Sequence, residues 1–357
     1  MTQSVVIVGA GIIGAATALQ LAKTGHSVRV ISAGVPDATH AAFGWVNASF
    51  FIDDDHHHLR AAGIAAWHRL AAAVPVSVTW PGCLCWDVDV EATFAKLRAF
   101  DYPVKVLSQS QIAALEPSLR TCPKQALFFP NEGAAHSPDL SQQLLTAAQA
   151  LGVQLINNVT VSGIAMQGDR AVGVETATGV ISADQVIVAA GTGSSRLAQS
   201  MGATVPLVSR PAYIMRTTPL PPMLDHILAT PEGEIRQEPS GQLLMPMAVG
   251  HQGDRSEMLT QSPVAAADDA MLRLRGLING LDEVQWAETL RAERPVPADD
   301  LPIVGALAEG LYVAVLHSGI TLGPVVAELI ATDIAGMLSN AESAMLAPYR
   351  PGRFIES

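Results

Sequence analysis

The chain begins with a strand, a glycine-rich turn and a helix in immediate succession. Ser4–Val8 reads SVVIV, a β-branched run typical of a buried strand, and the hexapeptide GAGIIG at 9–14 follows it directly. Ala15–Thr24 has the composition of a helix that Gly25 can cap, and His26–Ser32 predicts a second strand. A G-x-G-x-x-G motif inside such a strand–helix–strand unit is a strong signal for dinucleotide binding.

Each glycine of the motif has a physical task. Gly9 makes the tight turn, Gly11 lets the backbone approach a pyrophosphate, and Gly14 lets helix and strand pack closely. The N-terminus of the helix offers free N–H groups and a partial positive charge to the phosphates. The acidic residue that usually ends the second strand is replaced by Ser32, whose neutral hydroxyl makes no charge-assisted bond to a ribose. A neutral residue also repels a 2′-phosphate less, so NADP stays an alternative at this point.

The composition excludes several classes of protein. With 357 residues, 49% of them apolar and 15% charged, the chain is not intrinsically disordered and is long enough for two domains. A formal net charge of −12 disfavours binding to nucleic acid or to anionic membrane surfaces. The three cysteines are an odd and sparse set, which argues against a disulfide framework and for a reducing compartment. We therefore expect a cytoplasmic protein.

Two apolar stretches, 5–22 and 311–338, have the length of membrane segments. Glycines interrupt the first stretch, and no basic residue precedes it as one would in a signal peptide. The second stretch contains His317, Glu328 and Asp333, which would be costly to place in a bilayer. We therefore interpret both as buried core elements and expect no integral membrane segment.

Two clusters hold side chains that could bind a metal. In DDDHHH at 53–58, three adjacent histidines cannot share one helix face, and the acidic residues favour a solvated helix start. Cys83 and Cys85 lack a second pair or histidines at a zinc spacing. The sequence therefore predicts no metal site.

Two later blocks alternate strands and helices in the same way as the N-terminal unit. Within 133–193, the pattern predicts a helix (137–151), short strands (153–156 and 159–164), a hairpin (173–182) and a buried strand (185–190). Within 294–338, DLPIVG (300–305) precedes a strand (311–316), and HSGITLGP (317–324) leads into a long helix (321–338). Both ends of the chain therefore look related to dinucleotide binding.

Together these blocks resemble the FAD-dependent amino-acid oxidase superfamily, the group of glycine oxidase, sarcosine oxidase and D-amino-acid dehydrogenases. The resemblance lies in the N-terminal fingerprint combined with Arg294-Pro295, Asp300, Pro302, Gly305 and HSGITLGP. It implies an α/β fold, in which a Rossmann-like FAD-binding domain carries a second, antiparallel-sheet substrate domain of α+β type. The FAD-binding domain would be discontinuous, with residues 1–80, 131–205 and 291–357, and the substrate domain would comprise 81–130 and 206–290.

The resemblance implies FAD as the cofactor and suggests its contacts. Ser32 would face the adenosine ribose, Thr39 and His40 would lie near the pyrophosphate and ribityl chain, and Val161 would contact the adenine. The helix that starts near Thr321 would direct N–H donors at the pyrimidine side of the flavin. The predicted cofactor-binding residues are Gly9, Gly11, Ile12, Ile13, Gly14, Ser32, Ala33, Thr39, His40, Val161, Ala190, Gly191, Gly305, Ser318, Gly319, Ile320, Thr321 and Leu322.

Hydride transfer to a flavin requires that the protein orient the substrate and exclude water. Arg294 is the candidate anchor, because a guanidinium binds a carboxylate through two parallel hydrogen bonds. The alternative is a structural salt bridge from Arg294 to Glu293 or Asp300. His317 and Tyr213 are the other candidate catalytic residues.

The predicted function is FAD-dependent oxidation of the C–N bond of an amino acid or secondary amine, with hydride transfer to flavin N5 and hydrolysis of the imine. Two alternatives share the fold: a 2-hydroxy-acid dehydrogenase, and a flavin-binding subunit of a hetero-oligomeric dehydrogenase. The expected ligand is a small-molecule substrate, and a homo-oligomer or a partner dehydrogenase subunit are both compatible with the apolar composition.

Overall fold

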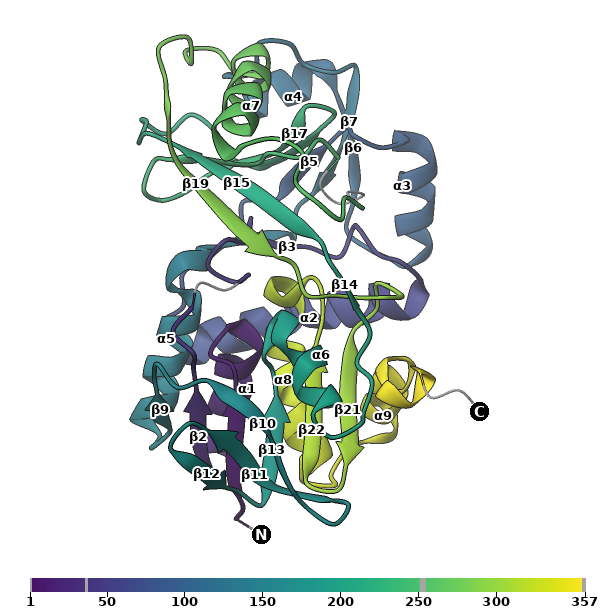
Figure 1. Cartoon of the computed structure of the whole chain (residues 1–357). Helices are drawn as coiled ribbons and strands as arrows, with labels where there is room; N and C mark the ends of the chain where they lie inside the picture. The colour runs from purple at the N-terminus through teal and green to yellow at the C-terminus, as the bar shows by residue number, and fades with distance from the viewer. Residues whose placement is uncertain (1, 36–37, 251–254, 355–357) are drawn as a thin grey trace.

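The computed structural model describes residues 2–35, 38–250 and 255–354. The chain folds into two parts, one above the other in Figure 1, with α2 (Asp54–Ala73) and β14 (Leu207–Val208) lying between them. Strand β14 pairs with β20 (Val296–Pro297). Within the described ranges, no helix is both long enough and apolar enough to cross a membrane.

The lower part contains a six-stranded sheet with the fingerprint strand near its centre. Its order is β21 (Ile303–Ala308), β22 (Leu311–Val315), β13 (Gln185–Val188), β1 (Ser4–Val8), β2 (Ser27–Ile31) and β9 (Gln154–Ile156). Neighbouring strands are parallel except β21, which is antiparallel to β22. This is the Rossmann-like parallel sheet that the strand–turn–helix–strand pattern predicts.

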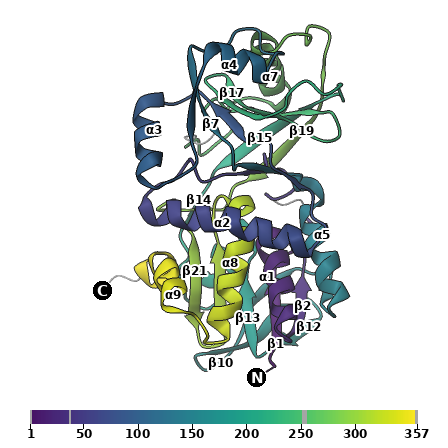
Figure 2. The ribbon, with the colours of Figure 1, turned by 180° about the vertical axis from the view of Figure 1, so that it is seen from behind.

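Strand β1 is apolar on both faces, so other elements pack on each side of the sheet, and the lower part has three layers. Val5 and Ile7 face the helices α1 (Ile12–Lys23), α5 (Ser137–Ala150) and α8 (Gly319–Ile334), which Figure 2 shows in front of the sheet. Val6 and Val8 face the antiparallel strands β10 (Val161–Gln167), β11 (Arg170–Thr176) and β12 (Gly179–Ser182). A strand buried on both sides is therefore uniformly hydrophobic.

The upper part contains an eight-stranded sheet. Its order is β19 (Trp286–Glu293), β15 (Pro211–Thr217), β18 (Leu243–Pro246), β17 (Gly233–Gln237), β16 (Ile227–Thr230), β5 (Cys83–Cys85), β7 (Gln125–Phe129) and β6 (Lys105–Ser108). The sheet is antiparallel, as expected, except that β16 and β5 are parallel. Helices α7 (Pro263–Leu277) and α4 (Gln109–Leu115) contribute to the core on its outer face, and β15 and β19 run down towards the lower part (Figure 1).

Short elements connect the two parts. Strands β3 (Trp45–Val46), β8 (Gly133–Ala135) and β4 (Val78–Thr79) form a small antiparallel sheet. The remaining α-helices of the described ranges are α3 (Val90–Ala99), α6 (Ser194–Gln199) and α9 (Asn340–Leu346).

The structure shifts three helix boundaries predicted from sequence. Helix α1 begins at Ile12, inside the fingerprint, because the extended backbone of Gly11 already forms its N-cap. Helix α8 begins at Gly319 and ends at Ile334, before Gly336, whose φ of +68° leaves the helical region.

At the start of α2, the acidic residues are exposed as expected, but His56 and His57 are buried, so this turn is only partly solvated. It also holds no cluster of three metal-ligating side chains among the described residues.

Candidate active site

A cavity of about 760 Å³ lies at the carboxyl ends of the parallel strands β1, β2, β13 and β22, and residues of β15 and β19 form its opposite wall. In open α/β sheets, ligands bind in the crevice outside the carboxyl ends of the strands, at the point where the strand order reverses. The volume falls in the range of ~300–1,000 Å³ typical of sites for cofactors and small molecules. The cavity is therefore the candidate site.

Most of the residues predicted from sequence meet on the wall of this cavity. They are Gly9, Gly11, Ile12, Ile13, Ser32, Ala33, Thr39, Val161, Ala190, Gly191, Arg294, His317, Ser318, Gly319, Ile320 and Thr321. Because they come from six separate segments of the chain, only the tertiary structure brings them together.

The fingerprint glycines have different surroundings. A Cβ atom on Gly9, which has a φ of +115°, would lie 2.2 Å from the carbonyl oxygen of Ala189. A Cβ on Gly14 would lie 2.0 Å from the carbonyl oxygen of Gly9, so Gly14 serves the contact between α1 and β1 and does not line the cavity. Gly11 lines the cavity, and the next amide, Ile12 N, donates to Thr39 Oγ1 at 3.1 Å. The N-terminus of α1 therefore faces the cavity, as an anion site requires.

Ser32 lies on the cavity wall at the end of β2, as the fingerprint predicts. Its Oγ accepts a hydrogen bond from Gly34 N at 3.2 Å. Arg196, which sequence reasoning did not identify, also lines the cavity and donates from Nη2 to the carbonyl oxygen of Val161 at 3.3 Å. This region thus offers a hydroxyl and a guanidinium in place of the usual carboxylate.

The N-terminus of α8 forms a second part of the wall. Its N-cap is Ser318, whose φ of 58° is left-handed. The Oγ1 of Thr321 donates to the carbonyl oxygen of Trp45 at 3.1 Å and accepts from Asn47 N at 3.2 Å. Thr321 therefore joins α8 to β3 and to Asn47, which follows it, and two helix N-termini face one cavity.

Arg60 of α2 is a cavity residue that the sequence did not reveal. It is 3% exposed and donates from Nη1 to Ser318 Oγ at 2.8 Å and from Nε to the carbonyl oxygen of Asn47 at 3.1 Å. Burial lowers the pKa of Arg60 to about 10, so it keeps its charge at neutral pH. Because Arg60 ends the acidic stretch DDDHHHLR, the sequence suggested a solvated turn there. The one sequence feature that pointed to its burial is the helical spacing, which places Arg60 beside His56 and His57, both of which are buried.

Arg294 and His317, two of the predicted catalytic residues, lie on the cavity wall. Arg294 is 9% exposed, and its Nε donates to the carbonyl oxygen of Arg210 at 3.0 Å. The two carboxylates considered as alternative partners bind elsewhere: Asp300 pairs with Arg255, and Glu293 lies 3.5 Å from Arg291. The Nε of Arg294 is thus anchored on a backbone carbonyl oxygen at the edge of the cavity.

Besides Gly14, four predicted residues do not line the cavity, and their expected roles are corrected. Tyr213 alternates with Ala212 and Ile214 along β15; these two line the cavity, whereas Tyr213 packs on the outer core with α7. A Cβ on Gly305 would lie 2.6 Å from Cδ of Pro351, so Gly305 serves packing of the C-terminal segment. The other two are Leu322, which is buried in the helix core, and His40, which is exposed.

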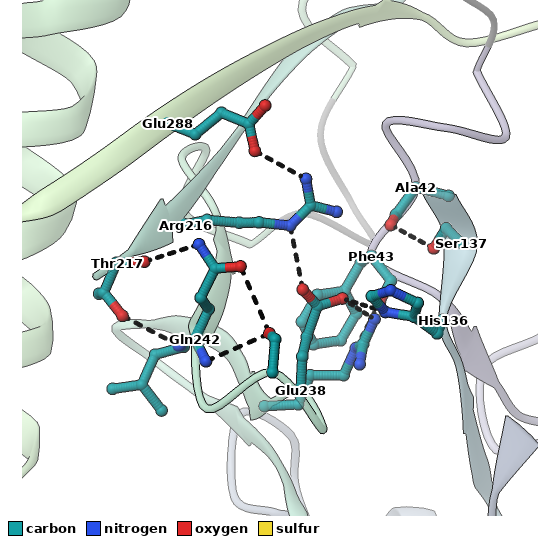
Figure 3. A network of polar contacts seen from close by, with 12 residues as sticks. Ala42, Phe43, His136, Ser137, Arg216, Thr217, Glu238, Gln242 and Glu288 are labelled. Atoms are coloured by element: carbon teal, nitrogen blue, oxygen red, sulfur yellow. Dashed lines mark hydrogen bonds and ion pairs between the residues drawn. The ribbon is translucent and has the colours of Figure 1, made fainter. Parts of the chain in front are cut away.

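A buried charge network lies beside the cavity on the inner face of the upper sheet (Figure 3). Glu238, 3% exposed, accepts from Arg216 Nε at 3.0 Å and from Arg236 Nη2 at 3.1 Å, and its Oε1 lies 3.2 Å from Nδ1 of His136. Arg236 also donates from Nε to the carbonyl oxygen of Phe43 at 2.6 Å. Since Phe43 lines the cavity, the network ties the cavity wall to the upper sheet.

The wall suits an anionic dinucleotide. Among the described lining residues there are four arginines, namely Arg60, Arg196, Arg291 and Arg294, and one acidic residue, Glu293. Together with the two helix N-termini, this charge balance favours phosphate groups and an anionic substrate.

Comparisons with known proteins agree with this geometry. A glycine oxidase from Geobacillus kaustophilus (strain HTA426) is 25% identical over 374 residues, covering 98% of this chain and 97% of that protein. The crystal structure of glycine oxidase from Geobacillus kaustophilus matches with a TM-score of 0.86 at 23% identity, covering 99% of this chain and 100% of that one. Iminodiacetate oxidase from Chelativorans sp. BNC1 matches with a TM-score of 0.84 at 23% identity, covering 97% and 98%.

The family model described as FAD dependent oxidoreductase (DAO) matches residues 4–332, which is most of the chain and includes both helix N-termini of the cavity. This match settles the choice of dinucleotide in favour of FAD over NADP. The chain belongs to the family of FAD-dependent oxidoreductases.

Proposed function

We propose that this FAD-dependent oxidoreductase oxidises the C–N bond of a small amino acid or secondary amine, and that Arg294 holds the carboxylate of that substrate. The observation that carries the proposal is the guanidinium of Arg294, fixed by the backbone of Arg210 on the cavity wall. The names of the relatives, glycine oxidase and iminodiacetate oxidase, support a carboxylate-bearing amine.

The cofactor would be held by the two helix N-termini. Gly11 and Ile13 would present N–H groups to the pyrophosphate, since Ile12 N already donates to Thr39 Oγ1, and Ser32 would contact the ribose. Gly319 and Ile320, at the start of α8, would lie at the flavin. Bound FAD supplies the hydride acceptor of the reaction.

The remaining work of the protein is orientation and exclusion of water. Arg294 would fix both the distance and the rotation of the substrate through a bidentate contact, which brings the C–H bond to one position above the cofactor. Ala212 and Ile214 of β15 line the cavity with apolar surface and limit water there. The imine product is then hydrolysed by water after oxidation.

We also propose the domain division 1–80, 131–205 and 291–357 against 81–130 and 206–290, and a cytoplasmic location. The strands of the eight-stranded sheet, at 83–129 and 211–293, support the division, although β19 continues past residue 290 to Glu293. All three cysteines are free, which supports a reducing compartment.

The test is anaerobic bleaching of the flavin in the purified holoenzyme by a panel of amino acids, N-methyl amino acids and 2-hydroxy acids. Bleaching by amines with a carboxylate, and release of the matching oxo acid, is the expected result. Bleaching by hydroxy acids alone would instead indicate a hydroxy-acid dehydrogenase. No bleaching by any compound would favour a flavin-binding subunit that needs a partner.

A further inference from the structure

A second, smaller pocket adjoins the cofactor cavity. Its volume is about 150 Å³, and it shares Arg60, Arg294, His317 and Ser318 with the larger cavity. The aromatic residues Phe50 and Phe51, from the loop before α2, form part of its wall. The two spaces are therefore adjacent, and a substrate held by Arg294 could extend from one into the other.

The described wall of this side pocket is strongly basic. It contains four arginines, Arg60, Arg210, Arg255 and Arg294, and one carboxylate, Asp300. Asp300 pairs with Arg255. Arg210 Nη1 lies 3.4 Å from Oε1 of Glu257, whose side chain is 73% exposed, and such an exposed partner neutralises little of the field. Arg210 therefore leaves positive charge on the described wall, and this charge favours an anion.

Arg60 is a buried cation whose hydrogen-bond partners carry no charge. Its three hydrogen bonds go to the carbonyl oxygen and side-chain oxygen of Asn47 and to Ser318 Oγ, all of them neutral acceptors. The carboxylate that acts on it at longer range, Glu132, accepts its own hydrogen bonds from Trp45 and other donors. A buried cation with only neutral partners is costly unless an anion compensates it.

His56, which also lines the side pocket, contributes no positive charge to it. Its Nδ1 accepts a hydrogen bond from Ile52 N at 3.2 Å, and burial lowers its pKa to about 3. His56 is therefore neutral at physiological pH, and the positive charge of the pocket comes from the arginines.

We propose that the side pocket receives a second carboxylate of the substrate, so that the enzyme acts on amino or imino dicarboxylates. The proposal rests on the proposed function, with the first carboxylate on Arg294 and the second facing Arg60. A volume of 150 Å³ corresponds to about five water molecules at ~30 Å³ each, which is enough for a carboxymethyl or carboxyethyl arm.

The first experiment uses the wild-type holoenzyme and needs no reaction. Matched ligands, succinate against butyrate and malonate against propionate, are titrated while the flavin absorbance is followed. The expected result is a Kd at least about tenfold lower for the dicarboxylate of each pair. Equal Kd values within each pair would overturn the proposal.

The second experiment compares R60Q with R69Q. Arg69 lies on the same helix, but it is exposed and pairs with Glu328, so it is a matched control. The ratio of kcat/KM for aspartate over asparagine should fall about tenfold in R60Q and stay unchanged in R69Q. If R60Q leaves this ratio unchanged and instead weakens sulfite addition to the flavin, Arg60 serves the cofactor and the proposal is wrong.

Two further measurements distinguish a failure of the side-pocket proposal from a failure of the proposed function. R210Q removes a second charge of the pocket but keeps the backbone carbonyl that holds Arg294, so it replaces R60Q if that variant does not fold. Here too the aspartate preference should decrease, and an unchanged preference would count against the pocket. Bleaching by monocarboxylate amines without any preference for dicarboxylates would refute the side-pocket proposal and leave the C–N oxidation intact.

Discussion

Tyr102 donates a hydrogen bond from its hydroxyl to Oε1 of Glu132 at 2.8 Å, in the interior of the protein. Glu132 also accepts from Trp45 Nε1 at 2.8 Å and from Ser49 N at 3.1 Å. The segment that it holds includes Asn47, which contacts both Thr321 and Arg60 at the cavity. A carboxylate outside the cavity therefore supports two of its wall residues.

The first prediction concerns pH and Glu132. Burial raises the pKa of Glu132 from 4.5 to about 7, against the effect of its hydrogen bonds. Between these values the unfolded chain has released a proton that the folded protein keeps, so stability falls as pH rises from about 4.5 to 7. The expected loss is on the order of 3 kcal/mol.

The E132Q variant is the reference, because it keeps His56 but lacks the titrating carboxyl group of Glu132. Titration of His56, whose pKa is lowered by burial, makes the protein more stable as the pH rises, which is the opposite effect. The free energy of unfolding is measured in denaturant for both proteins from pH 4.5 to 8. Wild type should lose stability relative to E132Q as the pH rises. A constant difference across this range would show that Glu132 does not titrate there.

The second prediction separates two glycines of the fingerprint. Gly11 has a φ of −68°, which any residue adopts, so G11V should fold but lose bound FAD. G14A should lose stability as well, because its Cβ would meet the carbonyl oxygen of Gly9 at 2.0 Å. Circular dichroism melting and the flavin content after gel filtration measure the two effects. Full FAD occupancy in G11V would place the pyrophosphate elsewhere.

The third prediction is that S32E tightens FAD binding. A carboxylate at the end of β2 makes charge-assisted hydrogen bonds to ribose hydroxyls, each contributing ~1.5–3 kcal/mol before reorganisation. We expect the Kd for FAD to fall about tenfold or more, measured by quenching of FAD fluorescence with the apoprotein. Weaker binding would mean that the hydroxyl of Ser32, which accepts from Gly34 N, already serves the ribose well.

The fourth prediction concerns R294K. Lysine keeps the charge but loses the planar fork and the Nε donor to the backbone of Arg210, so orientation of the substrate should suffer. We expect kcat/KM per bound flavin to fall ~10–1,000-fold, about 1.4–4 kcal/mol of transition-state stabilisation, with the flavin spectrum unchanged. R170K, at an exposed pair with Glu309, is the control. Normal turnover per flavin would remove Arg294 from the substrate site.

The fifth prediction concerns the charge network beside the cavity. E238Q leaves Arg216 and Arg236 buried without their shared carboxylate, which should cost ~3–5 kcal/mol of stability. E309Q removes an exposed ion pair and should cost about 1 kcal/mol or less. Denaturant unfolding of the holoenzymes measures both. Equal effects of the two variants would contradict a structural role for the network.

Much of the lower part could be predicted because its signals are local. The run Ser4–Val8 matches β1 residue for residue, since a strand buried on both faces must be apolar throughout. Ser137 and Pro138 mark the start of α5, because proline suits the first turn of a helix. Tyr213 was misplaced because strand alternation gives two faces but does not say which face meets the cavity.

The sequence by itself determined the fingerprint unit and the dinucleotide edge of the sheet. These features follow from glycine geometry and short-range periodicity, which act within a few residues. The tertiary structure alone showed that Arg60 and Arg196 reach the cavity. Arg60 meets Ser318 across 258 positions of sequence, and its burial depends on how α2 packs on α8, which no local pattern encodes.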